Sequence, residues 1–128
     1  MNAKAPARIR VASLYTDLSA RMEALREQHQ EVDLSREVVI QALEDGRAHY
    51  GINTGFGILA NKRIDARQLS ELQRNILLSH ACGVGEPVPP DITRLMLQLK
   101  IHALGLGQSG ISQTTFDQLL AHEYKGLL

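Results

Sequence analysis

The sequence has 128 residues, of which 44% are hydrophobic and 4% aromatic, with no tryptophan. Lysine plus arginine number 14, as do aspartate plus glutamate, so the formal net charge of +0 excludes the basic surface that nucleic acids and anionic lipids require. No apolar run is long enough to span a membrane, and the basic residues of 1–11 precede no hydrophobic segment, so we expect neither an anchor nor a secretory signal.

A composition poor in aromatic residues and rich in Leu, Ile, Val and Ala suits packed helices, and we expect one all-α domain over residues 1–128. Cys82 is the only cysteine, so no disulfide can form within the chain. This favours a reducing compartment, and we expect the cytoplasm.

The first half of the chain predicts two helices. An apolar stripe at helical spacing predicts a first helix over about 13–29, carried by Leu14, Leu18, Met22 and Leu25. Asp33 and Ser35 are both favoured N-cap residues, and apolar residues then follow at helical spacing as far as Gly46. We therefore expect a second, shorter helix that starts near one of these caps.

A third helix is predicted by Leu69, Leu72, Ile76 and Leu77, ending near Ala81. Gly83 follows it and is expected to adopt the left-handed conformation that ends many helices. The prolines of segment 85–90 exclude a helix there and predict a stiff connector.

The last part of the chain predicts two further helices. Asp91 is expected to cap a helix whose apolar stripe runs from Ile92 to Ala103 and ends before Gly105. Ser112 is expected to cap the final helix, which carries Phe116. Since no convincing alternating strand pattern or repeat occurs, the sequence predicts about five helices joined by loops.

Glycine is concentrated rather than dispersed: seven of the ten glycines fall in clusters at 51–57, 83–85 and 105–107. Such clusters mark backbone that turns tightly, approaches another group closely or moves. Tyr50 stands at the entrance of the first cluster. It is either a packed residue of a turn between two helices, or a phenol delivered to a substrate, which can act as a base only where positive charge or hydrogen bonds stabilise the phenolate.

Other side chains suggest chemistry less strongly. His80 lies in the last turn of the third predicted helix, where it either complements the helix dipole or hydrogen-bonds a substrate ring. The histidines have no spacing typical of a metal site, so we expect no metal. Cys82 is better explained as a small packed residue than as a nucleophile. The glycines of 105–110 follow no strand, which excludes a dinucleotide-binding loop.

Three blocks of the sequence, in order, resemble the aromatic amino-acid ammonia-lyases of the histidine and phenylalanine type. The resemblance covers about residues 34–120, whereas residues 1–33 match loosely and predict an N-terminal helix. The blocks are Tyr50-Gly51-Ile52-Asn53-Thr54-Gly55-Phe56-Gly57, then Leu72-Gln73-Arg74-Asn75-Ile76-Leu77-Leu78-Ser79-His80-Ala81-Cys82-Gly83-Val84-Gly85, then Arg94-Leu95-Met96 through Gly107-Gln108-Ser109-Gly110-Ile111.

The resemblance implies the N-terminal helical domain of the fumarase/aspartase-like lyase fold, in a homotetramer whose active sites draw on several subunits. It implies non-oxidative elimination of ammonia from a small amino-acid substrate, giving urocanate from histidine. The electrophile of this family is a methylidene-imidazolone group, formed autocatalytically from Ala-Ser-Gly. We expect no nucleic-acid or membrane partner.

By position, Tyr50 resembles the catalytic acid or base of the family, on a mobile lid loop. The lid residues are then Gly51, Asn53, Thr54, Gly55, Phe56 and Gly57. Ser79 and His80 occupy the place that discriminates between substrates. A Ser-His pair is typical of the histidine enzymes and suits an imidazole, which both donates and accepts hydrogen bonds.

The chain departs from the family in one respect: it contains no Ala-Ser-Gly, and its one Ser-Gly, Ser109-Gly110, follows Gln108. We therefore expect a truncated N-terminal fragment of a histidine ammonia-lyase that is inactive alone. One alternative is a non-catalytic helical module that associates with itself or with a full-length lyase through apolar residues such as Leu95, Met96 and Leu99. The other is a fragment of a tyrosine or phenylalanine ammonia-lyase or aminomutase, which the Ser79-His80 pair disfavours.

Overall fold

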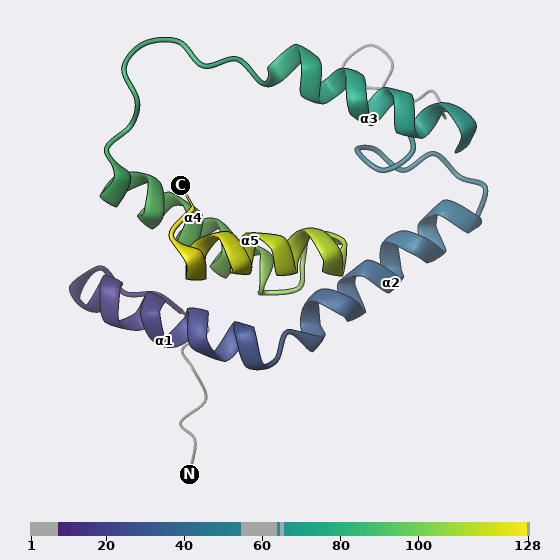
Figure 1. The fold of residues 1–128 in the computed structure, drawn as a ribbon. Coiled ribbons are helices and arrows are strands. Elements are labelled where there is room, and N and C mark those ends of the chain that lie inside the picture. Colours follow the sequence, from purple (N-terminus) through teal and green to yellow (C-terminus); the bar gives the residue numbers. More distant parts are fainter. Residues whose placement is uncertain (1–7, 55–63, 65, 128) are drawn as a thin grey trace. The chain divides into compact units, whose positions relative to one another are not determined.

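The computed structural model describes residues 8–54, 64 and 66–127. A short 3-10 helix, η1 (Val11–Ser13), leads into the α-helices seen in Figure 1. These are α1 (Leu14–Glu27), α2 (Gln30–Glu44), α3 (Ala66–His80), α4 (Pro90–Leu104) and α5 (Gln113–Lys125). The described ranges contain no β-strand, which confirms the all-α prediction. None of these helices has the length and apolar character needed to cross a membrane.

The chain divides into two compact units. The first consists of Met1–Val38 and Val88–Leu128, and the second of Val39–Pro87. The first unit therefore contains α1, α4 and α5, the second contains α3, and α2 has residues in both.

The core of the first unit forms where α1, α4 and α5 pack together with the start of α2. Phe116 and Ile101 are completely buried, and burial of such a side chain contributes about 1.5–3 kcal/mol. The buried cluster consists of Met22, Leu25, Val32, Ile101, Leu104, Phe116 and Leu120. The stripes predicted for α1 and α5 lie in this core. The stripe predicted for α4 was wrong: Ile92, Met96 and Leu99 are exposed, and α4 instead contributes Ile101 and Leu104 from another face.

A buried carboxylate joins three helices of the first unit. Glu123 on α5 is 6% exposed, and its Oε2 accepts from Arg26 Nη1 of α1 at 3.1 Å. Its Oε1 accepts from Gln98 Nε2 of α4 at 2.8 Å. Because both carboxylate oxygens are satisfied, the burial of this charge is compensated.

The loop between α4 and α5 is tied to α1 and α2 by hydrogen bonds. Arg21 Nη2 of α1 donates to the Gly105 carbonyl at 2.9 Å, and Arg36 Nη1 of α2 donates to the Gly110 carbonyl at 3.1 Å. Gly107 has φ +72°, and a Cβ placed there would lie 2.4 Å from the Glu31 carbonyl oxygen. Glycine is thus required at this position both by its backbone conformation and by the close approach of α2.

The predicted start of the second helix was wrong. Because α2 begins at Gln30, Asp33 and Ser35 lie within the helix instead of capping it. The earlier start places Val32 in the core with no exposed surface, and Asp33 in the first turn, where the helix dipole favours a negative charge. The Ser35 hydroxyl accepts from the Gly110 N–H at 2.9 Å instead.

Two further predictions about helix ends were also wrong. Helix α4 begins at Pro90, with Pro89 at its N-cap and no side-chain capping bond, so Asp91 lies in the first turn. Proline is pre-organised for the first helical position, where no N–H is needed. After α3, Gly83 does not have a positive φ, whereas Gly85 does, at 91°.

The predicted cap of the last helix is confirmed. Ser112 precedes α5 and its side chain accepts from the Thr115 N–H. At the other end Gly126 adopts the left-handed conformation, with φ 66°, and its N–H donates to the Glu123 carbonyl. Both ends therefore follow the preferences of serine and glycine at helix termini.

Candidate functional site

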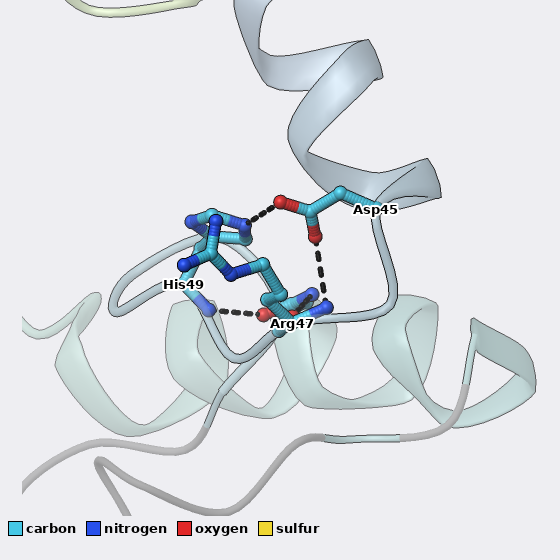
Figure 2. A network of polar contacts seen from close by, with 4 residues as sticks. Asp45, Arg47 and His49 are labelled. Carbon is cyan, nitrogen blue, oxygen red and sulfur yellow. Dashed lines mark hydrogen bonds and ion pairs between the residues drawn. The ribbon is translucent and has the colours of Figure 1, made fainter.

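Tyr50 lies in a turn that follows α2, in the second compact unit. The turn begins at the Asp45 carboxylate, which binds the chain in two places (Figure 2). Its Oδ1 accepts from the Arg47 N–H at 2.8 Å, and its Oδ2 contacts His49 Nε2 at 2.7 Å. Since a carboxylate can only accept, His49 carries a proton on Nε2 in this contact.

The side chain of Asn53 closes the turn from the other end. Its Oδ1 accepts from the His49 N–H at 2.8 Å, and its Nδ2 donates to the Arg47 carbonyl at 2.9 Å. Asn53 is 2% exposed, so its amide makes these two hydrogen bonds where water is largely excluded. A buried amide that pairs at both ends holds the backbone between 47 and 53 in a single arrangement.

Main-chain hydrogen bonds hold the backbone on both sides of Tyr50. The His49 carbonyl accepts from the N–H groups of Ile52 and Asn53, at 3.1 and 3.2 Å. Gly51 has φ +76°, a conformation that glycine adopts without a steric cost. The Tyr50 side chain is 66% exposed. The turn thus presents the phenol at the surface of the unit on a backbone fixed by its neighbours.

Of the remaining residues of the predicted lid, the structure describes Asn53 and Thr54. Asn53 and Thr54 are each 2% exposed, and the Asn53 carbonyl accepts from the Ile64 N–H at 2.8 Å. Gly55, Phe56 and Gly57 lie outside the described residues.

The charge of the Asp45 carboxylate is stabilised by its contacts in the first half of the turn. The hydrogen bond from the Arg47 N–H, opposed in part by desolvation and reinforced by His49, lowers the pKa of Asp45 below its usual value of 3.8. Asp45 therefore remains charged at neutral pH and keeps both of its contacts.

Ser79 and His80 lie in the last turn of α3, and both are exposed. The Ser79 hydroxyl donates to the Ile76 carbonyl at 3.0 Å and lies 2.9 Å from His80 Nδ1. His80 Nδ1 lies 2.9 Å from the same carbonyl. The two side chains are therefore oriented by α3 itself, through each other and through one main-chain carbonyl.

The structure places Tyr50, Ser79 and His80 in the same compact unit. Within the described residues, no group of three or more His, Cys, Asp or Glu side chains could hold a metal ion. The expectation that Cys82 is a packed residue was wrong: it is an exposed free thiol just beyond α3.

Sequence reasoning missed Asp45 and His49. Their separation of four residues was visible, but it indicates contact only where the intervening backbone is helical or nearly so. The chain leaves α2 after Glu44, and Gly46 has φ 76°. The pairing is therefore a product of the turn and not of a helix face.

Comparison with known proteins identifies the class. The family model described as aromatic amino acid lyase matches residues 9–128. The chain therefore belongs to the aromatic amino acid lyase family, as the three sequence blocks predicted.

Three curated relatives share one name, histidine ammonia-lyase. Histidine ammonia-lyase of Anaeromyxobacter sp. (strain K) is 51% identical over 94 residues, which cover 73% of this chain and 18% of that protein. Histidine ammonia-lyase of Geobacillus thermodenitrificans is 47% identical over 106 residues, covering 83% of this chain and 20% of that protein. That of Pseudomonas fluorescens is 46% identical over 91 residues, covering 71% and 18%. The chain thus spans about a fifth of the length of the curated relatives it matches.

Proposed function

We propose that this chain supplies the acid–base loop and the side-chain recognition pair of a histidine ammonia-lyase, which converts histidine to urocanate and ammonia. The observation that carries the proposal is the Tyr50 turn. Its backbone is held by Asn53 and Asp45, its phenol is exposed, and it lies in a chain about half identical to proteins named histidine ammonia-lyase.

Tyr50 is proposed as the group that moves a proton in the elimination. A base removes a proton from the substrate Cβ, the electron pair of that bond forms the Cα–Cβ double bond, and the Cα–N bond breaks to release ammonia. A phenol held on a fixed turn suits this task because proton transfer requires hydrogen-bond reach as well as a suitable proton affinity.

Ser79 and His80 are proposed to bind the substrate ring. Both present polar atoms at the exposed end of α3, and an imidazole both donates and accepts hydrogen bonds. A phenyl ring offers no hydrogen bond to either side chain, and a polar atom left unpaired is costly once water is excluded.

The residues of this chain do not themselves provide the family's electrophile, because the sequence contains no Ala-Ser-Gly. In this proposal the methylidene-imidazolone group, which activates the substrate amine, belongs to residues outside this chain. The chain alone is then inactive, and it acts in a cytoplasmic homo-oligomer that completes the site.

The test is a chimera in which this chain replaces the matching segment of the Anaeromyxobacter histidine ammonia-lyase. We expect the chimera to form urocanate, followed by its ultraviolet absorbance, and the isolated chain to form none. Tyr50→Phe removes the phenol oxygen while keeping the ring, and should lower kcat by roughly 10²–10⁴-fold, the usual contribution of a positioned acid or base.

Tyr124→Phe is the matched control, because Tyr124 is a similarly exposed phenol, 73% exposed, on α5. It should leave turnover nearly unchanged. A folded chimera with no turnover would favour the non-catalytic module, and full activity of Tyr50→Phe would refute the proposed role of the phenol.

A further inference from the structure

Three polar atoms meet in the last turn of α3: the Ile76 carbonyl oxygen, Ser79 Oγ and His80 Nδ1. The separations are 3.0 Å from Oγ to the carbonyl oxygen, 2.9 Å from Nδ1 to the carbonyl oxygen, and 2.9 Å from Oγ to Nδ1. All three are within hydrogen-bond distance, so the protons among them must be assigned together.

The carbonyl decides the assignment, because it can only accept. The Ser79 hydroxyl, which faces it at 3.0 Å, must donate its single proton there. His80 Nδ1 faces the same oxygen at 2.9 Å, so an unprotonated Nδ1 would set one lone pair against another. With Nδ1 protonated, the N–H is shared between the carbonyl and Ser79 Oγ, and all three contacts become favourable.

We infer that the Ile76 carbonyl and the Ser79 hydroxyl hold neutral His80 as its Nδ1–H tautomer, so that Nε2 is the acceptor nitrogen. Free histidine prefers the opposite tautomer in water. The end of α3 therefore selects which nitrogen is available to a ligand, as hydrogen bonds to one ring nitrogen do for the other. Besides the ring contact proposed above, Ser79 positions His80.

The assignment specifies the chemistry of the ligand, a step that rests on the proposed function. An Nε2 acceptor is satisfied by a side chain with a donor, such as the N–H of an imidazole. A phenyl side chain has no donor and would leave Nε2 unpaired. Discrimination thus follows from a missing hydrogen bond, which rejects a substrate more strongly than a difference in size does.

The direct test is nitrogen NMR of the full chain labelled with ¹⁵N-histidine, at a pH where the rings are neutral. His80 is assigned from the signal lost in His80→Gln. We expect a protonated Nδ1 and an unprotonated Nε2. His49 is an internal control of opposite sign, since its Nε2 contacts Asp45 Oδ2 at 2.7 Å and should carry the proton.

An Nε2–H signal for His80, or a mixture like that of free histidine, would overturn the inference. Ser79→Ala separates the two partners of His80. Because the carbonyl remains, the Nδ1–H form should still predominate, with a smaller excess. An unchanged tautomer ratio in Ser79→Ala would show that Ser79 has no positioning role.

The second readout uses the chimera. The side chain introduced by His80→Gln carries an amide oxygen that can accept near the position of Nε2, whereas the side chain introduced by His80→Leu has no acceptor. We expect His80→Leu to raise KM for histidine roughly ten- to hundredfold and His80→Gln to recover part of that loss. Equal KM values for the two variants would contradict the acceptor role. An inactive but folded chimera would count against the proposed function alone, because the NMR result does not depend on turnover.

Discussion

At the scale of single residues, the Tyr50 turn depends on one buried amide. Asn53 Oδ1 and Nδ2 pair with an N–H and a carbonyl four and six residues earlier in the chain. No other common side chain offers a donor and an acceptor at this length and in this arrangement. Aspartate would keep the acceptor but place a charge against the Arg47 carbonyl.

Asn53→Ala should loosen the turn, because it leaves the His49 N–H and the Arg47 carbonyl without their partners. The expected cost is about 1–3 kcal/mol, seen as faster hydrogen exchange of the His49 and Ile52 amides. Asn75→Ala is the matched control, since Asn75 is exposed on α3. Unchanged exchange in Asn53→Ala would show that the turn is held by other contacts.

Acid should open the same turn from its Asp45 end. The pKa of Asp45 is lowered in the folded chain. At a pH above 3.8, the usual pKa of aspartate, the carboxylate therefore stabilises the turn in full. This contribution is lost as the pH falls through the lowered pKa. Protection of the Arg47 amide, corrected for the intrinsic pH dependence of exchange, should decrease over that range.

Asp45→Asn provides the control for this titration. Its side-chain oxygen can still accept from the Arg47 N–H but does not titrate, so protection should be lower at neutral pH and constant in acid. Identical pH profiles for the two chains would exclude Asp45 as the titrating group.

At the scale of elements, helix existence was predictable and helix boundaries were only partly so. The apolar spacing of α1 and α5 indicated helices because each buries its predicted stripe in the shared core. Helix α4 was predicted too, but with the wrong face buried, because its sequence is apolar on more than one side. The start of α2 was missed because burial of Val32 extended the helix past two residues that local preference favours as caps. Local capping preference is about 1 kcal/mol, less than the burial of one core side chain.

Ser112 is the cap for which local preference and structure agree. Its hydroxyl accepts from the Thr115 N–H at 3.3 Å and lies 2.8 Å from Thr115 Oγ1. Ser112→Ala should destabilise the first unit by about 0.5–2 kcal/mol in urea unfolding. Ser19→Ala is the control, because Ser19 is exposed within α1, where alanine is the better helix former. An equal effect of the two substitutions on the free energy of unfolding would show that the Ser112 side chain does not cap α5.

At the scale of the whole molecule, the fully buried apolar side chains of the described residues all lie in the first unit. Phe116 is completely buried there and lies 5.3 Å from the ring of His29, centroid to centroid. Phe116→Ala should cost about 3–5 kcal/mol, because the lost contacts are not replaced and a cavity remains. The loss should appear as a lower unfolding midpoint and lower amide protection in α1, α4 and α5.

Met96→Ala is the control for this prediction, because Met96 on α4 is 59% exposed. It should change the free energy of unfolding by less than about 1 kcal/mol. A similar loss for both variants would mean that the buried cluster does not dominate the stability of the unit.

The candidate site illustrates what sequence can and cannot predict. Tyr50, Ser79 and His80 were singled out from motif resemblance, and the chemistry assigned to them remains a proposal. The polar contacts that hold them were not predicted, because each depends on backbone geometry. Asp45 meets His49 through a glycine with positive φ, and His80 meets a carbonyl one helical turn earlier.

The contact between Gly107 and the main chain at Glu31 limits how this sequence can vary. The atom nearest to an added Cβ is the Glu31 carbonyl oxygen, so a smaller neighbouring side chain could not make room for it. Gly51 shares the sign of φ, but among the described residues nothing lies within 4 Å of an added Cβ, so there the backbone conformation alone opposes asparagine or aspartate. A smaller side chain at Glu31 therefore cannot relieve a substitution at position 107, and any other residue there requires the main chain of α2 to move.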